Sequence, residues 1–443
     1  MKRIGFIALG VLSSSLLVLC PNCSKNAISS GDHPVIDNNN ISTQTQGAIT
    51  IKKYNVDRED APNVSDSDVS LLSQGNTAFA VDMYKKLSDN GGNVFFSPYS
   101  ISIALAMTWG GAHRQTETDM ASVLHFPFSQ TKLHPAFNAL DLALNRHVRE
   151  SGFDLHIVNQ LWGEKTYTFL PEYLKLVSID YGAAMNLLDF IGNPEPSRLI
   201  INQWVSDKTN QRIIDLIPQG IIDANTKLVL TNAIYFKAQW ADTFSGSETH
   251  DNAFYRSEGD TITTKFMSHG GIYGTISNAD YQAIELPYKG NETSMLIILP
   301  APGKMAFVEA NLSAEFLSAL KYPLEKSNVL LNIPKFKFTT ESIKLSAILQ
   351  SMGMSIAFSG LADFSGIDGI GGLYIGDVFH KAFVSVDEQG TEAAAATAVI
   401  VEVRCALPPP LVFQVNRPFI FLIRDVQTNA VLFMGKLTDP TKE

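Results

Sequence analysis

The sequence predicts an α+β protein with one large folded region, and three observations support this class. Helix-like stretches are grouped early in the chain and strand-like runs late, which is typical of α+β domains. The 443 residues are 45% hydrophobic, enough for one large or two medium domains. From about residue 69 to the C-terminus, no linker, repeat or low-complexity segment divides the chain.

The N-terminus has the features of an export signal. Lys2 and Arg3 precede an apolar run of about 16 residues that ends at Cys20, short for a membrane span but of the right length for a signal peptide. The sequence LVLC resembles a bacterial lipoprotein box, although such boxes prefer a small residue where Leu19 stands. We therefore predict a signal peptide over 1–20 and an exported protein lipidated on Cys20 at the cell envelope or surface. Plain secretion and an uncleaved anchor are the alternatives.

Residues 21–68 are predicted to be a disordered polar tether. Ser, Asn, Asp and Thr are in excess there, and such a composition cannot bury enough apolar surface to fold by itself. The folded domain is accordingly expected to span 69–443.

Within this domain, helices are expected first. Apolar residues recur at helical spacing in four stretches: 69–87, 97–109, 135–148 and 198–217. The second stretch begins at Ser97–Pro98, a common helix start. Strands are expected later, in six runs: 227–240, 283–300, 329–340, 378–388, 418–425 and 430–437.

The connection 387–410 is unusual because a connector of this length normally has structure of its own. Alternate residues of this segment differ in character. The odd-numbered residues from Thr391 to Val403 are all uncharged, and the first of them have small side chains. The even positions have charges at both ends. This pattern predicts a segment that can become a strand with one face buried. A short surface helix is the alternative, because EAAAAT has high helix propensity.

Composition and motifs argue against several functions. A net charge of −10 disfavours nucleic acid as a partner, and the three cysteines, Cys20, Cys23 and Cys405, provide no disulfide framework for the domain. We find no G-x-S-x-G, H-E-x-x-H or P-loop, and no G-x-G-x-x-G after a strand. The histidines show no metal-ligand spacing. We therefore expect no enzymatic activity, no cofactor and no metal.

The chain resembles the serpin family over essentially all of 69–443, and five long stretches carry the resemblance. They are NVFFSPYSISIALAMTWGGA (93–112), INQWVSDKTNQRIIDLIPQG (201–220), LVLTNAIYFKAQW (228–240), VFHKAFVSVDEQGTEAAAATA (378–398) and RPFIFLIRDVQTNAVLFMGKL (417–437). The resemblance implies an α+β serpin fold with about nine helices, three β-sheets and an exposed reactive-centre loop. It also implies a suicide-substrate mechanism, in which a protease cuts the loop and forms an acyl-enzyme. The cut loop then inserts into the main sheet as a strand.

By this resemblance, the 387–410 connection contains the hinge and the bond that the protease attacks. The hinge residues are Glu388, Gln389, Gly390, Thr391, Glu392, Ala393, Ala394, Ala395, Ala396 and Thr397. Non-inhibitory relatives tend to have charged, bulky or Pro residues at the alanine positions, so this hinge indicates an inhibitor. The family's spacing places the reactive bond at Arg404–Cys405, with a shift by one residue as the alternative.

Arg404 is the only basic residue between Lys381 and Arg417. The expected partner is therefore a serine protease of trypsin-like specificity, whose pocket contains a carboxylate. An Arg-specific cysteine protease is the alternative. Cys405 is either a tolerated small residue or a thiol whose oxidation would switch inhibition off.

Two further groups of residues follow from the resemblance. Ser97, Ser100, Asn232 and His380 match the polar cluster called the shutter, beneath the point where the main sheet opens. Trp240, Glu388 and Lys335 match the breach, where the loop first enters the sheet, and Lys335 is the expected ion-pair partner of Glu388. We expect a monomer that touches membranes only through its N-terminal lipid anchor. The competing functions are a non-inhibitory serpin acting as a binding or carrier surface protein, and a lipid-anchored adhesin.

Overall fold

The computed structural model describes residues 40–442 except 90, 152–153, 258, 321–323 and 392–408. The described residues belong to one unit, 38–443. The predicted signal peptide and Cys20 therefore lie outside the described residues, and so does the first part of the predicted tether.

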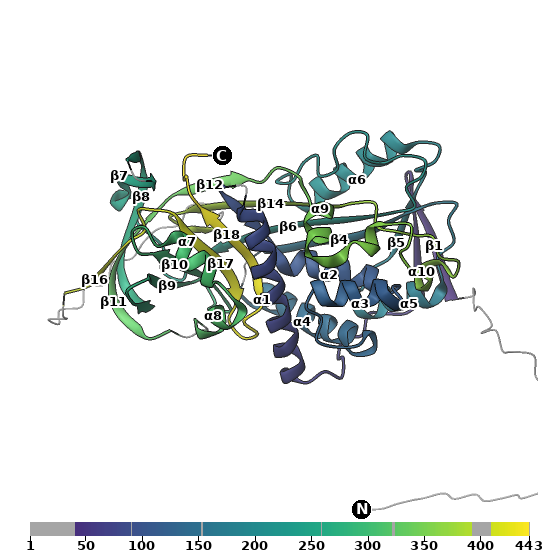
Figure 1. Cartoon of the computed structure of the whole chain (residues 1–443), viewed down its shortest axis with the longest axis horizontal. Coiled ribbons are helices and arrows are strands. Elements are labelled where there is room, and N and C mark those ends of the chain that lie inside the picture. Colours follow the sequence, from purple (N-terminus) through teal and green to yellow (C-terminus); the bar gives the residue numbers. More distant parts are fainter. Residues whose placement is uncertain are drawn as a thin grey trace, which may run out of the picture. The chain divides into compact units, whose positions relative to one another are not determined.

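The helices cluster in the first half of the sequence, as predicted (Figure 1). α2 has all twelve residues buried, which is expected of a helix that is apolar on every side. α6 is shorter than its predicted stretch, because Asn210 and Gln211 adopt positive φ after its end. The α-helices are α1 Asp66–Ser88, α2 Pro98–Trp109, α3 Arg114–Val123, α4 Gln130–Ser151, α5 Pro171–Tyr181, α6 Pro194–Lys208, α7 Met305–Asn311, α8 Ala314–Ala319, α9 Ser346–Leu349 and α10 Ser365–Asp368. Short turns of other helix types are η2 Gly246–Glu248, η3 Gln350–Met354 and η4 Ile356–Phe358.

The first network of strands contains the candidate site. Its order is β1-β2-β5-β4-β6-β15-β14-β12, with β13 paired to β14. Its strands are β1 Ile41–Gln46, β2 Ile49–Tyr54, β4 Asp154–Glu164, β5 Met185–Leu188, β6 Leu228–Gln239, β12 Phe336–Thr339, β13 Ile343–Lys344, β14 Val378–Asp387 and β15 Gly390–Thr391. The two long strands β6 and β14 are parallel to each other, whereas β15 is antiparallel to both.

The second network has the order β16-β11-β8-β9-β10-β17-β18-β3, with β7 paired to β8. Its strands are β3 Val94–Phe96, β7 His250–Ser257, β8 Asp260–Ser277, β9 Tyr281–Pro287, β10 Thr293–Pro300, β11 Lys326–Pro334, β16 Leu411–Gln414, β17 Phe419–Asp425 and β18 Val431–Leu437. The resemblance implied three sheets, but the described strands pair into two continuous networks. The long β8 is the reason, because it pairs with β7 and β11 over most of its length and with β9 at its end.

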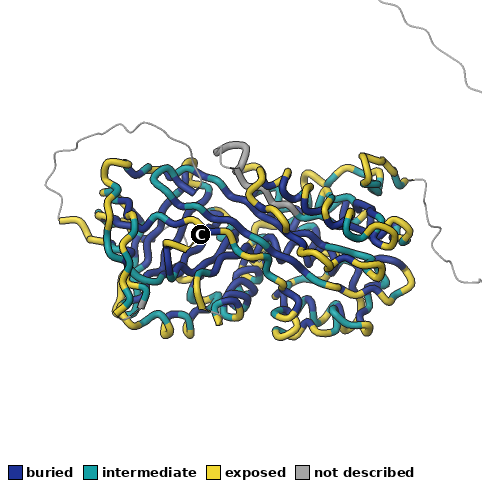
Figure 2. The backbone as a smooth tube through the Cα atoms, turned by 90° about the horizontal axis from the view of Figure 1, so that it is seen from above, coloured by how far each residue is buried: buried dark blue, intermediate teal, exposed yellow. Residues whose placement is uncertain are grey.

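The main hydrophobic core lies between the two networks, and α2 contacts β4 and β6 of the first and β18 of the second. Figure 2 shows the resulting buried interior along the strands, with exposed residues concentrated in the connections. A smaller cluster that includes Trp162, Ile201 and Val205 packs α6 against the other face of the first network. Consequently β14 is buried on both faces, with Val384 in the main core and Phe379 under α6.

The prediction of a disordered tether up to residue 68 is wrong over 41–54. These residues form the hairpin β1–β2, and β2 pairs with the edge strand β5. Beyond the hairpin, Arg58 binds α4 through an ion pair with Asp141 (2.8 Å) and a hydrogen bond from its Nε to Asn138 Oδ1 (2.7 Å). The prediction from composition was wrong here because the hairpin does not need a hydrophobic core of its own. Its backbone N–H and C=O groups find hydrogen-bond partners at the edge of an existing sheet.

Candidate functional site

The site is the place where β6 and β14 separate. The two strands pair directly over Leu230–Ile234 and Val378–Ala382. Farther along, β15 lies between them: Thr391 pairs with both Val386 and Ala238. In the first network, β6 and β14 are therefore hydrogen-bonded directly to each other along one part of their length. Along the adjacent part they are separated by two residues of an additional strand, β15.

Gly390 can occupy this position only because it has no side chain. Its φ is +156°, and a Cβ atom there would lie 2.0 Å from the carbonyl oxygen of Ala238. Any other residue would clash with the backbone of β6. The predicted hinge glycine thus allows a close approach between β15 and its neighbour.

Backbone bonds fix the turn that leads into β15. The N–H groups of Trp240 and Phe244 donate to the carbonyls of Gln389 and Glu388, each at 2.8 Å. Gln389 N–H donates to Asp387 Oδ1 at 2.9 Å, and burial raises the pKa of that carboxyl group. Beyond the turn, Thr391 Oγ1 lies 2.7 Å from Tyr288 Oη, which orients its side chain towards the main core.

The structure brings the three predicted breach residues together. Lys335 Nζ donates to Glu388 Oε2 at 2.6 Å, and Thr249 Oγ1 donates to Glu388 Oε1 at 2.7 Å. Burial by itself would raise the pKa of Glu388, but these two hydrogen bonds, a backbone hydrogen bond and the charge of Lys335 together lower the pKa below its ordinary value. Trp240 stacks on Tyr288 at 4.6 Å, and its Nε1 donates to the carbonyl of Asp387 at 2.9 Å.

The four predicted shutter residues also form one cluster, and each has no exposed surface. Asn232 Nδ2 donates to Ser100 Oγ at 2.6 Å, and Ser97 Oγ donates to the carbonyl of Leu432 at 2.6 Å. These contacts join β6, α2 and β18 directly below the opening. Every buried polar group in such a cluster needs a partner, so a change at one member affects the others.

His380 is the centre of this cluster, and its protonation state follows from its partners. The N–H of Ser97 can only donate, so His380 Nε2, at 3.1 Å, must accept. The proton is therefore on Nδ1, which donates to Asn232 Oδ1 at 2.5 Å. Burial lowers the pKa of His380 to about 3, consistent with a neutral ring.

Sequence reasoning missed several members of the site. Asn159 on β4 accepts from Asn232 Nδ2 at 2.7 Å. Thr249, Phe244 and Tyr288 come from connections between elements, some distance away in the sequence. Their residue types gave no signal, because a Thr or Tyr becomes part of a site only when folding places it there.

The remaining predicted residues lie outside the described residues. They are Glu392, Ala393, Ala394, Ala395, Ala396, Thr397, Arg404, Cys405 and Cys20. Within the described residues, no three His, Cys, Asp or Glu side chains are grouped so that they could hold a metal ion. In the same part of the chain, no helix combines the length and apolar character needed to cross a membrane.

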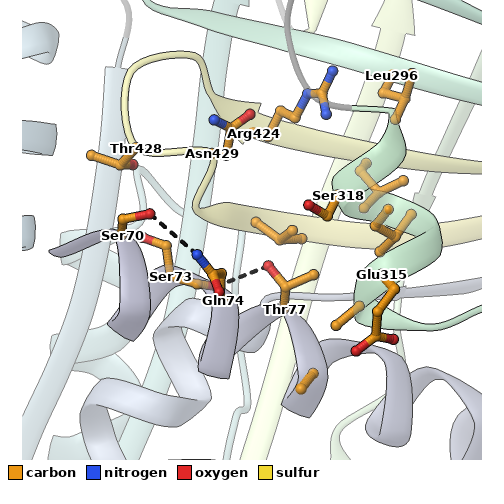
Figure 3. Close-up of a pocket in the computed structure, with 15 residues that line it drawn as sticks. Ser70, Ser73, Gln74, Thr77, Leu296, Glu315, Ser318, Arg424, Thr428 and Asn429 are labelled. Atoms are coloured by element: carbon orange, nitrogen blue, oxygen red, sulfur yellow. Dashed lines mark hydrogen bonds between the residues drawn. The ribbon is translucent and has the colours of Figure 1, made fainter. Parts of the chain in front are cut away.

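A cavity of about 540 Å³ lies apart from this site, between α1, α8 and β17 (Figure 3). Its lining mixes hydroxyl and amide side chains of α1, such as Ser73 and Gln74, with apolar residues such as Leu296 and Leu422. No predicted site residue contributes to this cavity.

Comparison with known proteins assigns the domain. Residues 74–440 match the family model described as "Serpin (serine protease inhibitor)". Antithrombin-III of Mus musculus is 39% identical over 393 residues, which are 86% of this chain and 84% of that protein. Leukocyte elastase inhibitor A of Mus musculus is 40% identical over 381 residues, 83% of this chain and 99% of that protein. The crystal structure of human thyroxine-binding globulin complexed with thyroxine matches with a TM-score of 0.75 and 31% identity, covering 84% of this chain and all of that one.

The expectation about enzymatic activity needs a correction. It was drawn from missing catalytic motifs, and a missing motif decides nothing about activity. What bears on the activity of the domain is the matched family description, which names it as a serine protease inhibitor.

Proposed function

The chain belongs to the serpin family, and from this premise we propose that it is a suicide-substrate inhibitor of trypsin-like serine proteases. The observation that carries the proposal is the opening between β6 and β14, which already contains Gly390 and Thr391. After Glu392, the sequence continues with four alanines and a threonine, small enough to enter a packed sheet without overpacking it.

The register of β15 supports insertion of the loop. Thr391 pairs with Val386 and Ala238, so an antiparallel continuation would bring residue 395 to Ala382 and residue 399 to Val378. Residues 395–399 would thus exchange the direct β6–β14 hydrogen bonds for bonds to a new central strand. After this exchange, the backbone N–H and C=O groups of β6 and β14 would still have hydrogen-bond partners. A sheet that exists with and without an inserted strand requires such partners in both states.

The same register accounts for the period of two in the loop. Val386 and Ala238 face the main core, and Thr391, their partner, faces it too. Residues 393, 395 and 397 would follow on this face, where the sequence has two alanines and a threonine. Thr397 would arrive beside His380 and Asn232, a polar pair that can offer its hydroxyl group a hydrogen bond.

The specificity and location are further parts of the proposal. Arg404 would be cut by a protease with a carboxylate in its specificity pocket. An Arg-specific cysteine protease is the second kind of target. We propose that the protein is exported, anchored through a lipid on Cys20 and monomeric, so that the loop meets proteases outside the cell.

A non-inhibitory serpin that acts as a binding or carrier protein is the second candidate. The likeness to human thyroxine-binding globulin in complex with thyroxine favours it. The alanines of the hinge favour inhibition instead, because a carrier does not need a loop that inserts rapidly.

One experiment separates these candidates. The purified protein is incubated with trypsin and analysed on a denaturing gel, and the released C-terminal fragment is identified by mass. We expect a covalent complex that survives SDS and a fragment that begins at Cys405. Cleavage at Arg404 without a complex would contradict inhibition of trypsin, and absence of cleavage within 387–410 would contradict the assigned reactive bond.

A further inference from the structure

The hairpin β1–β2 extends the first network at the edge farthest from the opening. From β6 outward the strand order is β6, β4, β5, β2 and β1, and each pair of neighbours is joined by backbone hydrogen bonds. Separating any two of them would break several of these bonds at once. The five strands, which we call the five-strand block, would therefore move together.

Insertion of the loop would require β6 and β14 to move apart by one further strand spacing, ~4.8 Å. β14 is held in place, because it pairs with β12, which begins at Phe336, two residues after β11 of the second network ends at Pro334. β14 also contacts β3 of the second network. The five-strand block is therefore the part that would move.

The block would turn about the end of β6 that β15 already separates from β14. Trp240, directly after β6, forms a bridge with Tyr288 that joins this end to the second network. The opposite end of β6 lies in one row with the hairpin, since Val229 pairs with β4, β4 with β5, and β5 with Ile51 of β2. Val229 precedes Trp240 by 11 residues, about 36 Å along a strand. The hairpin thus lies where the turning would move the block most.

Residues 55–61, which we call the strap, lead from β2 to α4. Arg58 Nη2 and Asp141 Oδ2 form an ion pair of 2.8 Å, and Arg58 Nε donates to Asn138 Oδ1 at 2.7 Å. The side chains of Arg58 and Asp141 are only 24% and 13% exposed. A partly buried contact at two points is stronger than an exposed surface ion pair.

The backbone of the strap is bonded as well. The carbonyl of Glu59 accepts from Asn138 Nδ2 at 2.7 Å, and the N–H of Glu59 donates to the carbonyl of Ile179 on α5 at 3.0 Å. The stem of Arg58 lies against Gly182, where a Cβ atom would be 3.0 Å from Arg58 Cδ. The strap is therefore fixed through both its backbone and its side chains.

α4 belongs to the part of the unit that would stay in place. It packs against α1, and α1 packs against β18 of the second network. Asp141 also accepts a hydrogen bond from Tyr99 Oη of α2 at 3.3 Å, and α2 contacts β18 as well. The strap thus joins the five-strand block to elements that are fixed on the second network.

We infer that the hairpin β1–β2 and the strap form a brake on the opening of the first network. This inference rests on the proposed function, because the brake acts on the movement that insertion requires. Turning the block away from α4 would break the bonds of Arg58 and Glu59, and this cost adds to the barrier for opening. The brake would therefore restrain the sheet of the uncut protein from opening before a protease has acted.

A brake of this kind acts only while both of its ends are attached. Detaching the strap from α4 would remove the whole restraint, and so would detaching β2 from β5. Doing both should then add nothing to either change alone. Two independent contributions to stability would instead add up.

The test measures how fast the protein takes up a labelled synthetic peptide with the sequence of residues 392–403, which would fill the opening beyond Thr391. Uptake is followed on a native gel and needs no protease. Arg58→Ala detaches the strap from α4. Ile51→Pro disrupts the pairing of β2 with β5, because proline cannot donate a backbone hydrogen bond in the sheet. The double variant combines the two changes.

Arg256→Ala is the matched control. Arg256 also forms two ion pairs, with Asp260 and Asp439, both at 2.7 Å, and it lies in the second network. Circular dichroism and thermal melting establish that each variant is folded. If Ile51→Pro does not fold, Thr50→Pro at the same edge replaces it.

We expect each single variant to take up the peptide about tenfold faster than the wild type, the double variant no faster than either, and the control within about twofold of the wild type. Unchanged uptake in the single variants would overturn the brake. An acceleration in the double variant equal to the product of the two single effects would also overturn it. Uptake by Arg256→Ala as fast as by Arg58→Ala would do the same, because the effect would not belong to the strap.

Failure of the proposed function gives a different result. A wild-type protein that takes up the peptide but forms no SDS-stable complex with trypsin would overturn inhibition of trypsin and leave the brake intact. If neither the wild type nor any variant takes up the peptide, the insertion between β6 and β14 is overturned, and the brake with it.

Discussion

Lys335 and Glu388 form an ion pair of 2.6 Å although 53 residues separate them in the sequence. Lys335 lies between β11 and β12, and Glu388 follows β14 directly. The pair therefore ties the start of the hinge to a neighbouring strand. Because Glu388 also accepts from Thr249, a single carboxylate holds two other segments at the point where the sheet opens.

Glu388→Lys should release this end of the hinge. The new ammonium group would face Lys335, and the like charges would repel each other at a site where Glu388 is only 15% exposed. We expect loop–sheet polymers or loss of inhibition, measured by size-exclusion chromatography and by titration against trypsin. Asp280→Lys, which disrupts the exposed pair with Lys304, serves as the control. Recovery in Lys335→Glu/Glu388→Lys would assign the defect to the pair, whereas a monomeric and fully active Glu388→Lys would refute the prediction.

Asn232→Ala should destabilise the native protein through its polar cluster. The change removes the acceptor of His380 Nδ1–H and the donor to Ser100 and Asn159, all of them below the opening. Leaving such buried groups unpaired costs about 2–3 kcal/mol. The unfolding midpoint in guanidinium should fall accordingly. Asn311→Ala, at an exposed amide on α7, should change the stability by less than about 0.5 kcal/mol.

Gly390→Ala should displace β15 from its place between β6 and β14. The added methyl group would lie 2.0 Å from the Ala238 carbonyl oxygen, a distance that the rigid strand cannot accommodate. With the first step of insertion hindered, more of the protein should be cleaved as a substrate. We expect the stoichiometry of inhibition of trypsin to rise several-fold. Gly360→Ala, at a position with open space and no positive φ, should leave the stoichiometry unchanged.

Thr397→Glu should convert the inhibitor into a substrate. In the proposed register this residue arrives beside His380 and Asn232, where a carboxylate group would be buried without a counter-charge. Insertion should stop part-way, and the gel should show cleavage at Arg404 with little complex. Thr397→Ser keeps the hydroxyl group and should inhibit normally. Equal amounts of complex from the two variants would show that the register is wrong.

Acid should weaken the native state through its buried histidines. His380 and His134 both have a pKa lowered to about 3 by burial. Below the ordinary histidine pKa of about 6.5, the unfolded chain takes up protons that the buried native rings do not accept. The stability that comes from keeping these rings neutral is therefore fully present above pH 6.5 and is lost as the pH falls towards 3. Each histidine contributes about 1.4 kcal/mol per pH unit in this range.

One carboxyl group acts in the opposite direction. Burial raises the pKa of Asp180 to about 6. Below pH 6 the native protein therefore binds a proton at Asp180 that the unfolded chain does not yet bind, and this proton uptake offsets part of the stability lost through the histidines. The measurement is the unfolding midpoint between pH 7.5 and 4.5 for the wild type and for His134→Gln. A shallower decline in the variant is expected, and identical pH profiles would contradict the assignment.

The sequence predicted the class and the framework of this protein for a physical reason. Hydrophobic periodicity and helix-start residues act locally, so stretches such as 69–87 and 378–388 could be recognised as α1 and β14 without knowledge of their neighbours. The breach and shutter residues could be named in advance because the resemblance to serpins supplied their roles. Local patterns failed at β1–β2, whose stability comes from pairing with β5 and not from its own composition.

What the sequence by itself determined is therefore the α+β class, the small-residue loop with its period of two, and the identity of the residues around the opening. Only the tertiary structure decided the register that aligns Thr391 with Val386 and Ala238, the tautomer of His380, and the contributions of Asn159, Thr249 and Tyr288. These features depend on which distant backbones lie within hydrogen-bonding distance. Such distances arise from the packing of the whole domain, and no local stretch of the chain encodes them.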